Sequence, residues 1–286
     1  MVSKKNRRDL LRLSGALAAS AIIGNRQTPF LKSVEAGVNE TAVRTRPVEF
    51  DGLVDLQVNG FAGVDFSDPK LTEEKILQSQ KAIQETGVTR FLPTLTTSSL
   101  KDFISCAKTI ARMKHPALVG FHMEGPYISP LDGARGAHPK EFVCLPNLDD
   151  FKRRQEAASG RIVLVSLAPE MEGALPMIEF LVKSGIRAAI AHTAATPAQI
   201  QDAVKAGATL STHLGNGCAQ MLPRHPNFIW EQLAEDRLLA SFIVDGNHLP
   251  PATIKSMIRA KTPLSFDSRH RCRRTGRASS RLIQVH

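Results

Sequence analysis

The stretch Gly120-Phe-His-Met-Glu-Gly-Pro-Tyr127 runs from a buried strand directly into a turn. Residues 117–121 are apolar enough for a strand that is covered on both faces, and Gly125-Pro126 forces the chain to turn. Glu124 is therefore expected at the carboxyl end of an interior strand, where a charge is costly unless something binds it. An acid that is solvated, or that caps the next element, is the alternative interpretation of this stretch alone.

Two later strands end in histidine in the same way. The apolar run at residues 186–191 is followed by His192, and the run at 208–212 is followed by His213. Two imidazoles, one carboxylate and an open position form the ligand set of a catalytic divalent-metal site, with zinc expected and iron or another divalent metal as alternatives. Such an ion lowers the pKa of bound water to about 7 and polarises a carbonyl, which favours metal-assisted hydrolysis. The alternative is that these are buried core residues whose hydrogen bonds are satisfied within the fold. That interpretation suits one polar strand end better than three at equivalent positions.

Strands and helices alternate along the rest of the chain, with short connections. We expect strands at residues 51–60, 88–93, 117–124, 161–168, 186–191, 208–212 and 239–245, and helices at 71–86, 100–113, 148–158, 173–184 and 196–206. This order predicts a parallel sheet with right-handed crossovers. Polar residues at the strand ends favour an α/β fold of the TIM (β/α)8 type, whose active sites lie at that face. A doubly wound open sheet is the alternative, although no Gly-rich phosphate fingerprint follows the first strand.

The net charge of +10 is concentrated at the two ends of the chain. Residues 1–12 carry a net +4 and residues 265–286 a net +5, whereas the body is almost neutral, with 26 basic and 25 acidic residues. Nucleic-acid binding requires a basic patch on the folded domain, so we expect no nucleic-acid partner. The four cysteines lack metal-site and disulfide spacing and are expected to be free thiols. No apolar run reaches the roughly 18 residues that a membrane span needs.

The amino terminus has the pattern of a targeting segment. Arg7-Arg8 precedes a short apolar stretch at residues 13–23, which resembles a twin-arginine export signal; an amphipathic helix is the alternative. Residues 24–47 are polar, with scattered Pro and Arg. We therefore expect a signal and linker at 1–47, a barrel at 48–264 and a basic tail at 265–286.

A series of short motifs carries a resemblance to a known family. The motifs are Asp55-Leu-Gln-Val-Asn-Gly60, Phe91-Leu-Pro-Thr-Leu-Thr-Thr97, His122-Met-Glu-Gly-Pro126, Gly136-Ala-His138, Leu167-Ala-Pro-Glu170, Ala191-His192, Thr212-His-Leu-Gly-Asn216 and Asp245-Gly-Asn-His248. In order and spacing they resemble the N-acetylglucosamine-6-phosphate deacetylases of the amidohydrolase superfamily, over about residues 51–263. The resemblance implies a TIM barrel, a homodimer and a cytoplasmic location, which conflicts with the export signal.

The same resemblance implies an activity. It is the hydrolysis of the acetamide of N-acetylglucosamine 6-phosphate to glucosamine 6-phosphate and acetate. Two alternatives stay open. The substrate could be another N-acetylated amino sugar phosphate, such as N-acetylgalactosamine 6-phosphate, or the chain could be a non-catalytic remnant that at most binds metal or ligand.

The resemblance also implies roles for particular residues. Glu124, His192 and His213 hold one metal ion, and His138 polarises the acetyl carbonyl. The vestigial positions of a second metal are Gln57 and Asn59, where many superfamily members have histidines. The substrate-binding positions are Ala137, His138, Asn216, Gly217, Arg224, Asp245 and His248. Arg224 suits the phosphate because its guanidinium offers a fixed fork of donors, and Gly217, where the family usually has Ala, is expected to loosen its loop.

One element of the family pattern is missing from the sequence. The family's eighth strand ends in an aspartate that works the metal-bound water, expected near residue 270. The chain reads Leu264-Ser-Phe-Asp-Ser-Arg-His270 there, and Asp267 is not assigned the role because no apolar strand leads to it. A one-base frameshift after Pro263 is our hypothesis, since residues 266–278 can be back-translated so that the next frame reads Ile-Leu-Val-Thr-Asp-Ala.

These features together predict an incomplete barrel. We expect about seven βα units, without the eighth strand or the family's small β-sandwich, and a disordered tail. Loss of the general base is expected to lower the rate by about 10²–10⁴-fold.

Overall fold

The computed structural model describes residues 52–261 of the chain. The expected signal and linker at 1–47 and the basic tail at 265–286, with its hypothesised frameshift, lie outside the described residues. The described part falls within one compact unit.

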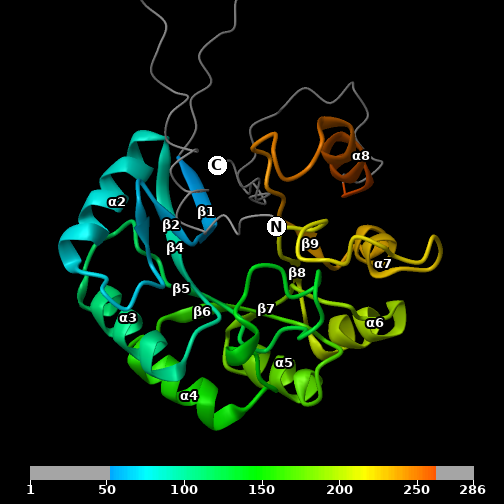
Figure 1. The fold of residues 1–286 in the computed structure, drawn as a ribbon, viewed down its shortest axis with the longest axis horizontal. Helices are drawn as coiled ribbons and strands as arrows, with labels where there is room; N and C mark the ends of the chain where they lie inside the picture. Colours follow the sequence, from blue (N-terminus) through cyan, green and yellow to red (C-terminus); the bar gives the residue numbers. More distant parts are fainter. Residues whose placement is uncertain (1–51, 262–286) are drawn as a thin grey trace, which may run out of the picture. The chain divides into compact units, whose positions relative to one another are not determined.

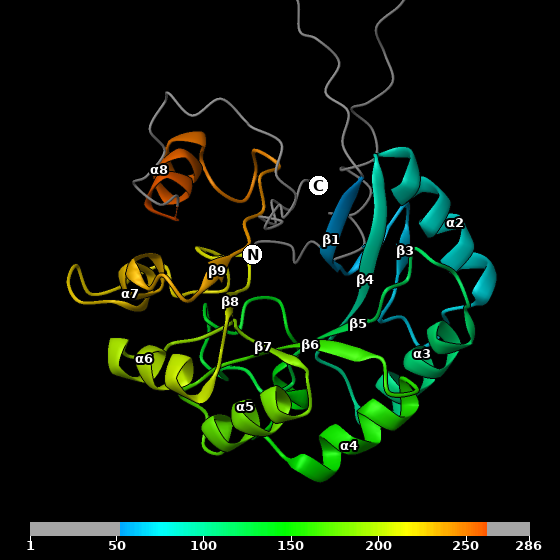
Figure 2. The ribbon, with the colours of Figure 1, turned by 180° about the vertical axis from the view of Figure 1, so that it is seen from behind.

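Seven parallel strands form one sheet whose spatial order follows the sequence order. The strands are β1 (Leu53–Val58), β4 (Val88–Thr96), β5 (Phe121–Glu124), β6 (Ile162–Leu167), β7 (Arg187–Ile190), β8 (Leu210–Ser211) and β9 (Leu239–Ala240). Figures 1 and 2 show the strands curving around a common axis with the helices outside them. Among the described residues β1 pairs only with β4, and β9 only with β8, so the sheet is open between its first and last strands. The incomplete TIM-type barrel is confirmed, since a doubly wound sheet would reverse its strand order.

Each of the first six helices lies between two consecutive strands of the sheet, and the seventh follows the last described strand. They are α2 (Glu73–Glu85), α3 (Leu100–Arg112), α4 (Leu148–Ala157), α5 (Ala174–Lys183), α6 (Pro197–Ala206), α7 (Phe228–Ala234) and α8 (Pro251–Lys261). The first five agree with the predicted helices to within one or two residues. The sequence analysis did not assign α7 and α8. The short elements that remain are β2 (Gly60–Phe61), β3 (Val64–Asp65) and a 3-10 turn, η1 (Lys140–Phe142).

The boundaries of α6 illustrate why the local prediction succeeds. The Thr196 side chain accepts from the backbone of Gln199, whose own side chain accepts from the Thr196 backbone, and Pro197 opens the first turn. Gly207 ends the helix at φ +112°, a left-handed conformation that favours glycine. All of these signals lie within the helix and its flanks.

The strands predicted at 208–212 and 239–245 are shorter in the structure than in the sequence analysis. Each forms a two-residue ladder, β8 and β9. Beyond the ladder the chain turns: His213 has φ +34°, and Asp245 accepts backbone hydrogen bonds from Asn247 and His248. Because the chain that follows β8 turns at His213, it offers β9 no ladder partner beyond Ser241, so the prediction of strand out to residue 245 is wrong.

The core has two layers, because successive strand residues face opposite sides of the sheet. Outward-facing side chains such as Phe91, Phe121 and Val165 join the helices in the main core. The inward-facing side chains Leu92, Leu164, Ala189 and Leu210 form a separate cluster inside the curve of the sheet. The polar residues of the candidate site pack against this inner apolar layer.

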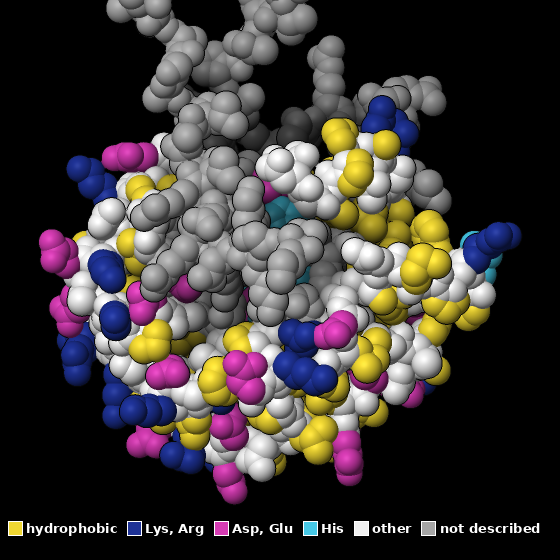
Figure 3. Space-filling view, in the orientation of Figure 1, with side chains coloured by type: hydrophobic (Ala, Val, Ile, Leu, Met, Phe, Trp, Pro, Cys, Tyr) yellow, Lys and Arg dark blue, Asp and Glu magenta, His cyan; other side chains and the backbone are white. Residues whose placement is uncertain are grey.

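Surface charges are mixed. On the face shown in Figure 3, basic and acidic side chains are interspersed, in keeping with the near-neutral body counted from the sequence. Across residues 52–261, the helices are all too short or too polar to cross a membrane.

Candidate metal centre

Because side chains alternate along each strand, the inward-facing residues that follow the inner apolar cluster in each strand form the next layer of the interior. Two residues beyond Leu164 and Leu210 lie Ser166 and Thr212, which face the same side as His122. The Ser166 hydroxyl lies 2.7 Å from His122 Nε2 and 2.8 Å from Thr212 Oγ1. Two residues beyond His122, Glu124 points into the same interior. A buried polar layer therefore separates the inner apolar layer from Glu124.

Glu124 is the centre of the cluster. The residue is only 1% exposed. Its Oε1 accepts from Gln57 Nε2 at 2.7 Å and lies 2.9 Å from His213 Nε2 and 3.3 Å from His192 Nε2. Burial alone would raise the pKa of the Glu124 carboxyl, but the contacts with the two imidazoles outweigh burial and hold that pKa well below its ordinary value. The site therefore keeps an anionic carboxylate away from water.

Both histidines leave their strands in an unusual backbone conformation. His192 has φ +47° and His213 has φ +34°, in the left-handed region that non-glycine residues seldom adopt. Such conformations concentrate at functional sites, where the surrounding structure enforces them. The two predicted ligands therefore share a conformation that the sequence analysis did not anticipate.

The hydrogen bonds of His192 fix which nitrogen faces the cluster. Its Nδ1 lies 3.1 Å from the backbone carbonyl of Ala134, and a carbonyl can only accept. A neutral His192 that donates from Nδ1 to this carbonyl would have the lone pair of Nε2 free to ligate an ion at the cluster. This is the arrangement typical of a histidine that ligates a metal through one nitrogen while the other donates to a carbonyl.

The donor set fits a divalent cation. One ligand atom each from Glu124, His192 and His213 lies within 4.8 Å of the others, and all three residues are buried. His213 Nδ1 is buried and has no hydrogen-bond partner among the described residues. A carboxylate with two imidazoles matches the nitrogen and oxygen preference of zinc. The sequence analysis predicted this grouping, and the structure brings the three side chains together.

His138 reaches the cluster from the long loop after β5. Its Nε2 lies 3.1 Å from His192 Nε2 and 3.8 Å from Glu124 Oε2, and its Nδ1 lies 2.7 Å from the Thr97 hydroxyl. The adjacent Ala137 is exposed. Thr97 was not singled out from the sequence, because only the fold brings it to His138.

The two vestigial metal positions have different surroundings. Gln57 is buried and bonded to Glu124, whereas Asn59, just beyond β1, is exposed. An amide at Gln57 can stabilise the Glu124 anion by donating to it.

The loop after β8 lies against His192. A Cβ at Gly217, where φ is +58°, would lie 2.6 Å from His192 Nδ1, and one at Gly136 would lie 3.1 Å from His192 Cε1. Asn216 bonds back to the His213 carbonyl, with N–H at 2.9 Å and Nδ2 at 3.3 Å. Gly217 therefore permits close packing of this loop, a role that differs from the looser loop expected from the sequence.

The remaining predicted substrate residues are Arg224, Asp245 and His248. His248 Nδ1 lies 2.7 Å from Asp245 Oδ2, and Arg224 is exposed. In the described part of the chain, no hydrogen bond joins any of these three to the Glu124 cluster. The sequence motif predicted Asp245 and His248 as substrate-binding residues, and the structure shows that their side chains contact each other.

His122 is a buried histidine that the sequence analysis quoted in a motif without giving it a role. Its Nδ1 lies 3.1 Å from the Leu56 carbonyl and its Nε2 faces Ser166. Burial lowers the pKa of His122 to about 4, against a partial rise from the nearby Glu124 charge. It is therefore neutral at pH 7. Its alternation with Glu124 on β5 is the signal that could have placed it inside the barrel.

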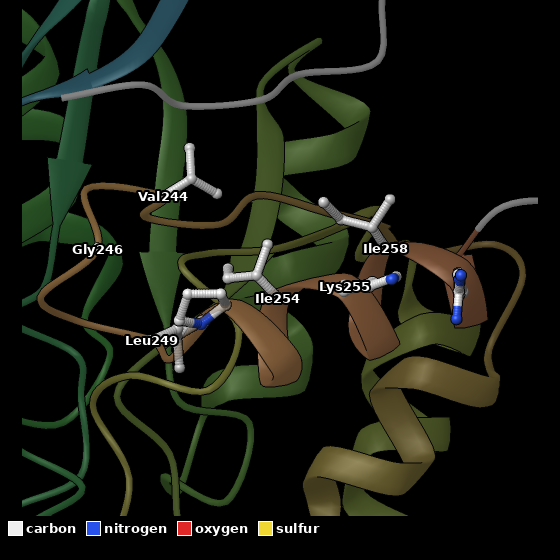
Figure 4. Close-up of a pocket in the computed structure, with 8 residues that line it drawn as sticks. Val244, Gly246, Leu249, Ile254, Lys255 and Ile258 are labelled. Carbon is white, nitrogen blue, oxygen red and sulfur yellow. The ribbon is translucent and has the colours of Figure 1, made fainter. Parts of the chain in front are cut away.

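A cleft with a volume of about 510 Å³ lies elsewhere, against α8 (Figure 4). Its lining is Val244, Gly246, Leu249, Pro251, Ile254, Lys255, Ile258 and Arg259. Its described lining includes no histidine or carboxylate, so the cleft lacks the ligand types that are grouped around Glu124.

Comparisons with known proteins agree with the resemblance in the motifs. No family model matches the chain. N-acetylglucosamine-6-phosphate deacetylase of Bacillus subtilis (strain 168) is 34% identical over 242 residues, covering 82% of this chain and 58% of the relative. N-acetylgalactosamine-6-phosphate deacetylase of Escherichia coli O157:H7 is 32% identical over 206 residues, covering 70% and 54%.

Solved structures give the same picture. The crystal structure of N-acetyl-D-glucosamine-6-phosphate deacetylase from Mycobacterium smegmatis matches with a TM-score of 0.69 at 31% identity, covering 74% of this chain and 55% of that chain. A mutant of that enzyme has been solved in complex with N-acetyl-D-glucosamine-6-phosphate. The present chain spans little more than half the length of the relatives that it matches.

Proposed function

Because this chain belongs by sequence and by fold to the N-acetylglucosamine-6-phosphate deacetylases, we propose that it is a metal-dependent hydrolase that removes the acetyl group of N-acetylglucosamine 6-phosphate. The products are glucosamine 6-phosphate and acetate. The observation that carries this proposal is the buried cluster of Glu124, His192 and His213 at the carboxyl ends of three parallel strands. Its donor set is that of a catalytic metal site with an open position.

Glu124, His192 and His213 would hold one divalent ion, with zinc favoured by the nitrogen and oxygen donors. When bound, such an ion polarises the acetyl carbonyl and lowers the pKa of a water to about 7. Gln57 supports the arrangement by donating to Glu124 at 2.7 Å. His138 Nε2 lies beside the cluster, so a His138 ring that carries its proton on Nε2 would donate to the carbonyl oxygen.

The activity of this chain is proposed to be weak. The aspartate expected near residue 270 from the family pattern does not stand there in the sequence. We therefore expect the chain to bind metal and substrate but to turn the substrate over slowly. General-base catalysis typically raises the rate of such a reaction by about 10²–10⁴-fold. Sequencing the gene across codons 260–275 tests the frameshift hypothesis, which an intact frame with no hidden Ile-Leu-Val-Thr-Asp would exclude.

The experiment on function measures acetate release from N-acetylglucosamine 6-phosphate by the full chain loaded with Zn²⁺, with Glu124→Gln as the control. Slow release that depends on Glu124 supports the proposal. Release by the Glu124→Gln protein at the same rate would refute the proposal. An ordinary rate of release by the unmodified chain would refute the account of the missing aspartate.

A second substrate deserves the same assay. Because the E. coli relative is named as an N-acetylgalactosamine-6-phosphate deacetylase and matches at 32% identity, the galacto epimer is the alternative substrate. The ratio of kcat/KM for the two epimers decides between them. Metal binding without release from either sugar phosphate would instead indicate a non-catalytic remnant.

The proposed location rests on the proposed substrate, and the proposed assembly rests on the family resemblance. Sugar phosphates are charged and do not cross a bilayer unaided, so we propose that the protein works in the cytoplasm, as a homodimer. Arg7-Arg8 lie outside the described residues. Fractionation of cells that produce tagged protein, and light scattering on the purified chain, test the two statements; tagged protein in the periplasm or a monomeric mass would contradict them.

A further inference from the structure

We propose that Glu170 and Ser241 are positioning residues that hold the strained backbone of the two histidine ligands, His192 and His213. Neither residue belongs to the cluster around Glu124. Glu170 ends the motif Leu167-Ala-Pro-Glu170, which the proposed function leaves without a role. This inference rests on the proposed metal site and is independent of which sugar is the substrate.

The strain at His192 and His213 calls for a stabilising partner. Their φ values are +47° and +34°. For a residue with a Cβ, a left-handed backbone is disfavoured and persists only where neighbouring groups over-determine it. Each histidine is flanked by hydrogen bonds that supply such a constraint.

Glu170 acts on the two residues that follow His192. Thr193 Oγ1 donates to Glu170 Oε2 at 2.5 Å, and the Ala194 N–H donates to Glu170 Oε1 at 2.6 Å. Hydrogen bonds to an ionised carboxylate are shorter and stronger than those between neutral groups. No salt bridge joins Glu170 to a basic side chain within residues 52–261. Its two oxygens therefore fix the turn in which His192 stands.

Ser241 acts on His213 itself. The His213 N–H donates to Ser241 Oγ at 2.8 Å, and the Ser241 hydroxyl lies 3.4 Å from the Ser211 carbonyl, to which it donates. The next N–H, of Leu214, donates to the Ser241 carbonyl at 2.9 Å. Ser241 is 4% exposed, so water does not compete for these bonds. The hydroxyl links the backbone on either side of Thr212 and defines the turn at His213.

In both arrangements the supporting residue lies at the end of the neighbouring strand in the sheet. Glu170 lies beyond the end of β6, which pairs with β7, the strand that leads to His192. Ser241 lies beyond the end of β9, which pairs with β8, the strand that leads to His213. Each ligand is thus oriented by the adjacent strand end. Removing such a support from around a metal ligand typically weakens metal affinity by about 10–100-fold.

The test is a Co²⁺ titration of the full chain, followed by the visible absorption of the ion. Glu170→Ala and Ser241→Ala are expected to weaken Co²⁺ binding by about 10–100-fold and to alter the spectrum. Ser241→Thr, which keeps the hydroxyl, is expected to restore both. The controls are Asp202→Ala, which removes a carboxylate paired with Lys205 on α6, and Ser79→Ala, which removes a buried hydroxyl without a partner among the described residues. Both controls are expected to bind as the unmodified chain does.

A second measurement needs no metal. Amide hydrogen exchange of the metal-free chain should be roughly three- to tenfold faster at Ala194 in Glu170→Ala and at His213 in Ser241→Ala, because each amide loses its acceptor. Should Glu170→Ala fail to fold, Thr193→Val carries that arm: it removes one of the two bonds to Glu170 and is expected to weaken Co²⁺ binding, with Thr193→Ser restoring it.

The outcomes separate this inference from the proposed metal site. If the unmodified chain and Glu124→Gln bind Co²⁺ equally, the metal site is wrong and the positioning role falls with it. If binding depends on Glu124 but the alanine variants keep the affinity and spectrum of the unmodified chain, the site stands and the positioning role is refuted. Unchanged amide exchange at both positions would refute it as well.

Discussion

Replacing Gly217 by alanine tests how closely the loop after β8 packs on a metal ligand. Gly217 has φ +58°, and a Cβ there would lie 2.6 Å from His192 Nδ1, 2.9 Å from Cε1 and 3.2 Å from Cγ. No real Cβ contact is that short, so either the loop or the imidazole must move. The resemblance in sequence makes alanine the usual family residue at this position, so the variant also asks whether this chain has departed from its relatives' packing.

The expected cost has two parts. A left-handed alanine costs about 1–2 kcal/mol, partly offset by about 0.4–1 kcal/mol from the stiffer unfolded chain. Displacing a packed ring adds about 1–3 kcal/mol, as for other overpacked sites. Gly185→Ala is the matched control, because Gly185 has φ +75° and open space around its Cβ position. We expect a loss of about 1 kcal/mol in the control and about 2–4 kcal/mol in Gly217→Ala.

Equilibrium unfolding in urea measures both losses as a shift of midpoint at constant slope. Gly217→Ala is expected to unfold at a clearly lower urea concentration than Gly185→Ala. Equal midpoints for the two variants would mean that the ring contact is absent in solution, and the packing of the loop on His192 described above would be wrong.

Three further predictions concern the ion pair on α4, the turn after β9 and the metal. Asp150→Asn leaves the 3% exposed Arg154 guanidinium without the carboxylate that it contacts at 2.8 Å, so we expect a loss of about 3–5 kcal/mol in urea unfolding; a loss below 1 kcal/mol would show that solvent screens the pair. For Asp245, burial acts to raise the pKa, but hydrogen bonds from His248 and Asn247 outweigh it and lower the pKa in the folded state. The stabilisation that Asp245 contributes is therefore complete above its unfolded-state pKa of about 3.9 and is lost as the pH falls through its lower folded-state pKa. The difference in stability between the unmodified chain and Asp245→Asn should therefore shrink below about pH 4. A difference that stays constant with pH would contradict this prediction. Zn²⁺ at a hundredfold excess over its Kd should raise the free energy of unfolding by about 2.7 kcal/mol, reversibly with a chelator, and should leave Glu124→Gln unchanged; equal stabilisation of both proteins would place the ion elsewhere.

The order of the seven strands, the first five helices and the three strand-end residues were predictable from the sequence alone. Helix caps such as Thr196-Pro197 and stop signals such as Gly207 act over one turn, so they can be recognised without the fold. Glu124, His192 and His213 were predictable for a related reason. Once the strands are parallel and consecutive, their carboxyl ends meet at one face, so a polar residue at each end implies a cluster.

The partners that orient these ligands were decided only by the tertiary structure. Thr97 meets His138 across 41 residues, Gln57 meets Glu124 across 67, and His192 meets the Ala134 carbonyl across 58. No local periodicity encodes contacts over such separations. The same is true of the positive φ values at His192 and His213, because a bulky residue enters that region only when tertiary contacts compensate for it. The sequence thus determined which atoms could bind a metal, and the curving of the strands around a common interior determined how those atoms are held.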